Sequence, residues 1–98
     1  MTTPTLAEIL SVVSAEYMIP TDVLLTPEKR TLPVTRARHV AQYLACTVGY
    51  MSKGQIAEEF KQRDHSAVGY ALTKISKLVL TDEAVRDRVG RLKRGLIK

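Results

Sequence analysis

A run of four polar side chains in the second half of the chain carries the groups best suited to recognise another molecule. Arg63, Asp64, His65 and Ser66 are consecutive. An aspartate accepts a hydrogen bond from the amino group of cytosine, and a serine hydrogen-bonds to either type of base. Asp64 is also a favourable N-cap for a helix that begins at His65. Both interpretations of Asp64, base contact and helix cap, remain open at this point.

The residues that follow predict a helix from His65 to about Val79. Spacing of i, i+3 and i+4 gives an inward apolar stripe of Val68, Ala71, Leu72, Ile75 and Val79. The opposite face carries Ser66, Ala67, Gly69, Tyr70, Thr73, Lys74 and Lys77. The first part of this face is small and polar, which allows close approach to base edges, and the later part is basic, which suits phosphates. An ordinary solvated face explains the lysines equally well.

A shorter helix is predicted just before this one. Ser52 and Gln55 form a capping box. The inward residues would be Ile56, Ala57 and Phe60. Residues 61–63 then form a tight connection, so that residues 52–79 have the arrangement of a helix-turn-helix. Lys53, at the exposed start of the first of these helices, is a candidate for a phosphate contact.

The other elements are also predicted to be helical. Helices are expected over residues 6–17, over about 34–48 and from Thr81 as an N-cap onward, with a short turn at 21–25 and a loop at 26–33. Thr5 and Glu8 form a capping box for the first helix, Pro20 stops it, and Thr21 caps the turn. No alternating apolar pattern predicts a strand. The expected fold class is therefore all-α, a small helical bundle forming one domain over residues 1–98.

The charge of the chain is distributed unevenly. Lys and Arg outnumber Asp and Glu by 15 to 10, which gives a net charge of +5. Residues 1–28 contain four acids and no base, whereas residues 29–98 contain every base and carry +9. A basic excess confined to one part of a chain favours an anionic polymer or surface as the partner.

Several classes of protein are disfavoured by the composition. A single cysteine, Cys46, excludes an internal disulfide, and with two histidines it is too little for a structural zinc site. No apolar run is long enough to cross a membrane. The chain has no G-x-x-x-x-G-K-[ST] motif for a nucleotide. No nucleophile and base are arranged for catalysis, so we expect neither an enzyme nor a cofactor, metal or nucleotide site.

Several short motifs follow one another along the chain. They are Ala15-Glu16-Tyr17, Leu24-Leu25, Lys29-Arg30, Arg36-Ala37-Arg38, Ile56-Ala57 with Phe60, and Arg63-Asp64-His65-Ser66-Ala67-Val68 followed by Ala71 and Lys74-Ile75. In this order they resemble the DNA-binding domain of DnaA, the bacterial chromosomal replication initiator. The similarity covers roughly residues 12–96. It implies a helical bundle related in architecture to the Trp repressor, without the ATPase module of the full initiator. The chain is therefore expected to be a stand-alone relative of this domain or an excised part.

The resemblance also assigns roles to residues. It implies that the helix starting at His65 contacts the major groove and that Arg30, in a basic loop, enters the minor groove. The residues expected to bind DNA are Lys29, Arg30, Arg36, Arg38, His39, Lys53, Arg63, Asp64, His65, Ser66, Ala67, Tyr70 and Lys74. Among them Arg38 and His39 are expected to contact phosphate. Ala67 departs from the family, which usually has a β-branched hydroxyl residue at this position.

We therefore expect sequence-specific binding of double-stranded DNA at a DnaA-box-like site, in control of replication initiation or of transcription. The expected location is the cytoplasm, on the nucleoid. The alternative from another class is a protein-interaction module that regulates the replication machinery and has replication initiation proteins as partners. Selection of bound DNA from random duplexes would separate these two hypotheses.

Overall fold

The computed structural model describes residues 3–97, which form six helices and no strand. The first helix, α1 (Leu6–Tyr17), begins with the expected capping box, because Thr5 accepts from the backbone of Glu8 while the Glu8 side chain accepts from the backbone of Thr5. It ends where Met18 adopts a left-handed backbone conformation. Its buried side chains are Ile9, Leu10 and Val13.

The next two helices begin earlier than the sequence predicts. The short helix α2 (Thr21–Leu24) has Pro20 as its N-cap, and Thr21 lies inside the helix without capping it. The long helix α3 (Leu32–Thr47) takes in Pro33 as part of its first turn. Proline is favoured there because its fixed φ suits a helix and its missing N–H would have no partner anyway. The predicted starts at Thr21 and Val34 were therefore wrong by one or two residues.

The helix-turn-helix is confirmed. It consists of α4 (Lys53–Glu59) and α5 (His65–Thr81). Ser52 and Gln55 make the capping box of α4, and Asp64 caps α5. Phe60, at the end of α4, is completely buried, and Lys61 has a φ of 57° where the chain reverses direction. The turn between the two helices is thus tight and anchored in the core.

The last helix, α6 (Glu83–Leu96), is capped by Asp82 and not by Thr81 as predicted. The Asp82 carboxylate accepts from the backbone N–H of Val85 at 3.2 Å. Thr81 belongs to α5, and its hydroxyl donates back to the carbonyl of Lys77. Two cap-forming residues stand side by side here, and the acidic one at the helix N-terminus is favoured by the helix dipole as well.

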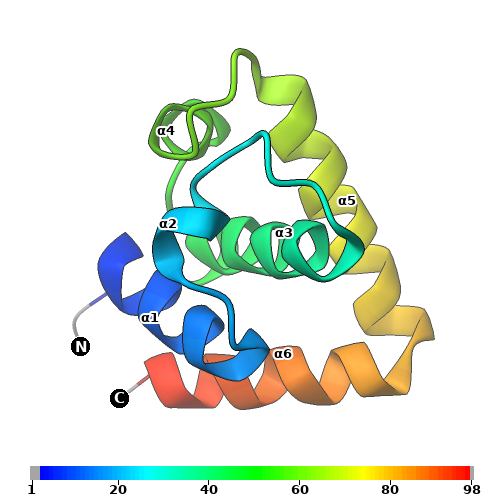
Figure 1. Ribbon diagram of the computed structural model, residues 1–98. Coiled ribbons are helices and arrows are strands. Elements are labelled where there is room, and N and C mark those ends of the chain that lie inside the picture. The colour runs from blue at the N-terminus through cyan, green and yellow to red at the C-terminus, as the bar shows by residue number, and fades with distance from the viewer. Residues whose placement is uncertain (1–2, 98) are drawn as a thin grey trace.

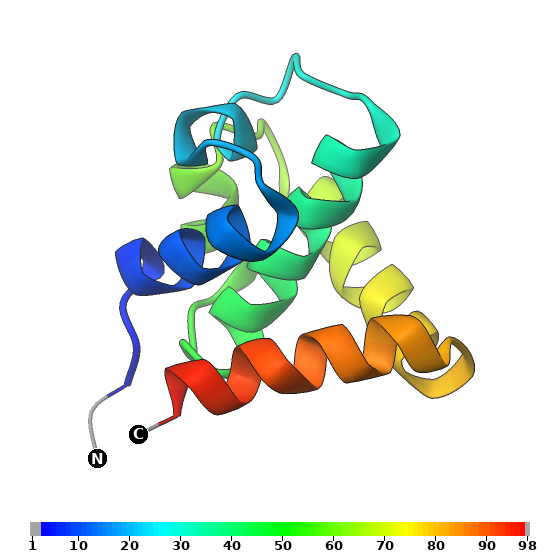
Figure 2. The same cartoon turned by 60° about the horizontal axis from the view of Figure 1, so that its bottom comes forward.

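The helices surround α3, which contacts α1, α2, α4 and α5. In Figure 1 the helix-turn-helix and the loop before α3 lie at the top, and α6 runs along the bottom. Figure 2 shows α6 crossing the molecule from the end of α5 to the side of α1, which agrees with its contacts. The all-α prediction is confirmed. Within residues 3–97 no helix combines the length and apolarity that crossing a membrane requires.

Candidate nucleic-acid interface

The first turn of α5 presents its polar side chains to solvent. Asp64 has extended backbone geometry, and its carboxylate accepts from the backbone N–H of Ser66 at 2.9 Å. Asp64, His65, Ser66 and Ala67 are all exposed. The capping interpretation of Asp64 is therefore confirmed. One carboxylate oxygen makes this bond, so the other can still accept from a base, and that contact stays a prediction.

Two side chains, one from each helix, bridge α4 and the first half of α5. A methyl group placed on Gly54 of α4 would come within 3.2 Å of the His65 imidazole. A methyl group on Gly69 of α5 would meet the ammonium group of Lys53 at 3.9 Å. His65 therefore lies over α4, and Lys53 extends along α5. The sequence could not predict either contact, because each joins residues on different helices.

The turn of the helix-turn-helix is fixed to α3 by a buried amide. Gln42 is completely buried in α3, and its Nε2 donates to Oε1 of Gln62 at 3.1 Å. The backbone N–H of Gln62 also donates to the carbonyl of Ala57 at 2.8 Å. Sequence reasoning missed Gln42, although its place one turn after Arg38 on the buried side of α3 is a usable signal. These bonds hold the start of α5 in place.

Arg38 is buried and bonded mainly within the protein, so its predicted phosphate contact stays a prediction. Its side chain is 4% exposed and donates to four backbone carbonyls. These belong to Leu24, Val23, Thr26 and Lys29, at 2.7, 3.1, 2.6 and 3.0 Å respectively. Burial and the nearby Arg30 lower the pKa of this guanidinium, while Glu28 raises it. Two of these carbonyls end α2 and two lie in the loop before α3, so Arg38 ties that loop and the end of α2 to α3.

The segment that Arg38 holds carries the basic loop. Lys29 and Arg30 are exposed. The Arg30 side chain donates from Nε to the carbonyl of Pro27 at 3.2 Å. This bond uses one donor of the guanidinium and directs it back along the loop, so a contact with DNA would require the side chain to extend from this position.

An open groove joins the basic loop to the helix-turn-helix. We call it the recognition groove, and its lining includes Pro27, Glu28, Arg30, Thr35, Arg38, His39, Lys61, Gln62, Arg63, Asp64 and Ala67. The groove thus brings Arg30 next to the start of α5, although the two are more than thirty residues apart in the chain. Of the predicted site residues, the groove collects Arg30, Arg38, His39, Arg63, Asp64 and Ala67.

His39 forms the link between the recognition groove and the exposed side of α5. Its ring meets the Tyr70 ring edge to face, with 5.8 Å between centroids, and the Lys74 ammonium lies 5.8 Å from the centroid of Tyr70. Burial lowers the pKa of His39, and the positive charges of Lys74, Arg38 and Arg36 lower it further. The free protein therefore favours the neutral imidazole.

This shift predicts that acid weakens the fold through His39. Because the folded-state pKa lies below that of the unfolded chain, the unfolded chain binds more protons as the pH falls from about 6.5. Stability that is present above this pH is then lost. Urea unfolding at pH 7.5 and 5.5 should show a larger loss of stability for the wild type than for His39→Asn. Equal losses would contradict the assignment, because every other titrating group is shared by both proteins.

Arg36 lies apart from the other predicted DNA contacts. Its side chain is half-buried and lines a different hollow, shared with α6. It is still near enough to His39 to lower the pKa of that group. The structure therefore brings most of the predicted residues to one side, leaves Arg36 at its edge and withdraws Arg38 into the protein.

Comparison with known proteins agrees with this arrangement. The family model for the bacterial DnaA protein helix-turn-helix matches residues 6–75. The chromosomal replication initiator proteins DnaA of Rhodopseudomonas palustris strain BisB18 and Bradyrhizobium strain ORS 278 are each 42% identical to the chain over 89 residues. The match covers 91% of this chain and 19% and 18% of these relatives, so the chain spans about a fifth of their length. The chain therefore belongs to the family of the DnaA helix-turn-helix, the DNA-binding domain of bacterial replication initiators.

Proposed function

We propose that the chain binds double-stranded DNA sequence-specifically, with the first turn of α5 in the major groove and Arg30 in the adjacent minor groove. The observation that carries this proposal is the recognition groove, which joins the basic loop to the exposed start of α5. A major groove about 12 Å wide admits one helix. An arginine in a narrow minor groove is favoured by the negative potential there.

The proposal divides the exposed side chains into two groups. Asp64, His65, Ser66 and Ala67 occupy the turn that would meet base edges, where hydrogen bonds and apolar contacts give specificity. The phosphate contacts would come from exposed or half-exposed basic side chains on the same side of the molecule. These are Lys29, Arg36, Lys53, Arg63 and Lys74, with His39 and Tyr70 beside them. Arg38 is left out of this group because it is 4% exposed and its Nε and one terminal nitrogen donate to carbonyls inside the protein.

The biological process proposed for this binding is control of replication initiation. The relatives quoted above are named as chromosomal replication initiators, and none of those names refers to transcription. A DnaA-box-like target, action on the nucleoid and contact with initiation proteins are parts of the same proposal. Ala67 predicts a target that differs from the usual box, because alanine offers a methyl group for thymine but no hydroxyl.

Selection from a random duplex library tests this function directly. DNA retained by the purified chain at physiological salt is sequenced over successive rounds. We expect enrichment of one short asymmetric site, and Ser66→Ala should alter the preferred base at one position of that site. Retention without any enriched sequence would contradict specific recognition and leave only attraction between charges.

The salt dependence of binding counts the phosphate contacts. If about four to six basic residues contact phosphates, the logarithm of the association constant K should fall with log salt at a slope of about −4 to −5. Each contact contributes about −0.9 to this slope. Titrations of a labelled duplex at several salt concentrations measure this slope. The double variant Lys53→Gln/Lys74→Gln should make it shallower by about 2. A nearly flat slope for the wild type would rule out the phosphate assignments.

A further inference from the structure

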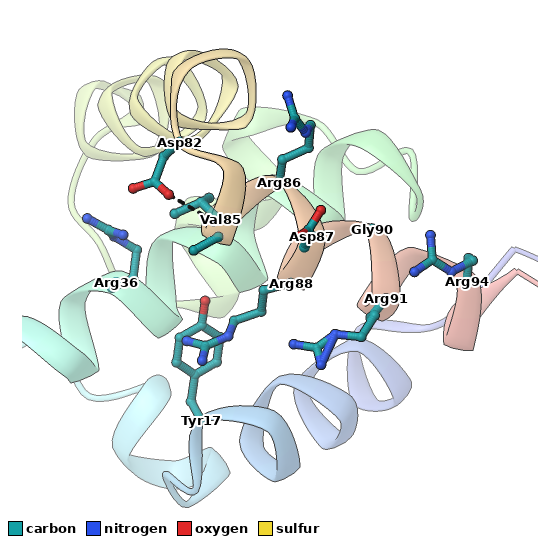
Figure 3. A pocket seen from close by; sticks show the side chains of 11 residues that line it. Tyr17, Arg36, Asp82, Val85, Arg86, Asp87, Arg88, Gly90, Arg91 and Arg94 are labelled. Carbon is teal, nitrogen blue, oxygen red and sulfur yellow. Dashed lines mark hydrogen bonds between the residues drawn. The ribbon is translucent and has the colours of Figure 1, made fainter.

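A second basic site lies at the opposite end of α5 from the recognition groove. We call it the arginine hollow. It has a volume of about 1000 Å³ and is bordered by α6, the end of α1 and the start of α3 (Figure 3). The 17 residues of α5 separate the two sites by about 25 Å at 1.5 Å per residue. In Figure 1 the turn between α4 and α5 lies at the top, whereas α6 runs along the bottom. A ligand in the hollow and DNA on the first turn of α5 would therefore not collide.

Two arginines that line the hollow share a carboxylate beside it. Oε2 of Glu16, on α1, accepts a hydrogen bond from a terminal nitrogen of Arg91 at 3.1 Å, and Nε of Arg88 lies 3.2 Å from the same oxygen. The Arg88 guanidinium also lies over the Tyr17 ring, 4.8 Å from its centroid. In Figure 3 both arginines reach from α6 toward α1. Two guanidinium groups thus meet at one carboxylate oxygen, which shows that arginines of α6 can pair with an acidic side chain here.

Two more arginines on the same helix have no ion pair within residues 3–97. Arg86 and Arg94 line the hollow and are exposed. They stand on either side of Gly90, two turns apart along α6. The guanidinium groups of Arg86 and Arg94 are therefore free to pair with carboxylates of another molecule, as Arg88 and Arg91 pair with Glu16.

Gly90 keeps the floor of the hollow open. A methyl group on its Cα would lie 3.3 Å from a terminal nitrogen of Arg94, so that side chain crosses the glycine closely. Its φ is not positive, so the backbone does not require glycine here. Glycine disfavours a helix more than any residue except proline. The space it leaves lets a chain approach α6 between Arg86 and Arg94.

We propose that the arginine hollow binds an extended acidic segment of a partner protein, beyond the DNA binding proposed above. About six residues of extended chain match the length of α6. Acidic side chains would pair with Arg86 and Arg94, and apolar ones would lie on Tyr17 and Val85. The hollow also contains the carboxylates of Asp82 and Asp87, so acidic residues of the segment are expected only where they face arginines, with neutral residues between them. Duplex DNA fits less well, because its evenly spaced phosphates have no neutral positions.

The test uses a fluorescent decapeptide that repeats Glu-Glu-Leu, titrated with the full chain at physiological salt. We expect saturable binding that Arg86→Gln/Arg94→Gln weakens at least tenfold, with duplex affinity within twofold of the wild type. Lys53→Gln/Lys74→Gln removes the same amount of charge from the DNA-binding side. It should weaken duplex binding and leave peptide affinity close to that of the wild type. If both double variants weaken the peptide equally, or if bound duplex displaces the peptide, the hollow is not a separate site. Duplex binding by the wild type tests the DNA proposal independently.

A pair of glycine variants separates binding from stability. Gly90→Ala should raise Tm because alanine favours a helix, yet it should weaken the peptide several-fold by moving Arg94 and filling the floor. Gly95→Ala is the matched control, since a methyl group there meets nothing within 4 Å. It should raise Tm and leave peptide affinity unchanged. Unchanged peptide affinity in Gly90→Ala would overturn the role of the floor and with it the proposed path of the segment.

Discussion

Replacing Arg38 with methionine is expected to lower the free energy of unfolding by about 2–5 kcal/mol and to remove specific DNA binding. Methionine fills a similar volume but has no donors for the four carbonyls that now accept from Arg38, of which those of Val23 and Thr26 also accept from a backbone N–H. Hydrogen bonds to a charged group contribute about 1.5–3 kcal/mol each at most, and a buried carbonyl left unsatisfied costs about 1–3 kcal/mol. Leu24 is the most affected, because its carbonyl lies in the buried part of this cluster.

The loss of DNA binding follows from the loop that these carbonyls belong to. Thr26 and Lys29 frame the segment that carries Arg30, so releasing them frees Arg30 from its place in the recognition groove. Arg38→Lys should restore only part of the stability, since one ammonium group cannot replace the planar fork of a guanidinium.

Arg36→Met is the matched control for stability. It removes the same side chain two residues earlier on α3, where the arginine is only half-buried. Arg36→Met should lower the free energy of unfolding by less than about 0.5 kcal/mol, as most surface substitutions do. Urea denaturation gives both values, and duplex binding is measured at a temperature where circular dichroism shows each variant to be folded. An Arg38→Met protein that is as stable as the wild type would contradict the anchoring role.

Local signals in the sequence were sufficient for most helix boundaries. The capping boxes at Thr5 and Ser52 and the cap at Asp64 depend on bonds within three residues, so they can be read from the order of residues alone. The predicted N-cap of α6 at Thr81 was wrong because two adjacent residues, Thr81 and Asp82, can both cap a helix. The start of α3 failed because Pro33 was assigned to the loop, although proline is equally compatible with a first turn.

The two arginines near the start of α3 show where sequence reasoning about the site stops. Arg36 and Arg38 look alike in the sequence, and both were assigned to DNA. Arg38 lies on the same side of α3 as Gln42 and Ala45, which are buried. The end of α2 covers Arg38, and the turn of the helix-turn-helix contacts Gln42. The spacing i, i+4 and i+7 shows in the sequence that these three side chains share one face of the helix. Polar side chains on a shared face can be recognised as buried only when the segment that packs against them is known.

Contacts between distant parts of the chain could not be predicted at all. The ion pair of Glu16 with Arg91 joins residues 75 positions apart. The arginines of α6 are spread around that helix in sequence, so no single stripe indicated a site. Only the packing of α6 against α1 decides which of them face the hollow. The recognition groove is a similar case, because the loop meets α5 through the fold of α3.

Asp64 provides a test of whether α5 contacts bases, because its two roles respond differently to substitution. Asp64→Ala removes the cap of α5 and should cost about 1 kcal/mol of stability. Asp64→Ser should restore most of that stability, since a serine hydroxyl also accepts from the second N–H of a helix. Neither variant has a carboxylate that can reach a cytosine amino group.

Both variants are therefore expected to lose discrimination at one base pair of the selected site. A good base contact is worth about 1–3 kcal/mol, so the preference of the wild type for cytosine at that position should fall by roughly one to two orders of magnitude, at about 1.4 kcal/mol for each factor of ten. Affinity for unrelated duplexes should not fall, because removing a negative charge near phosphates does not weaken attraction to DNA. Competition between duplexes that differ at one position measures the preference. If Asp64→Ser matches the wild type in both stability and preference, Asp64 is a cap alone. Specificity at that position would then have to come from its neighbours His65 and Ser66.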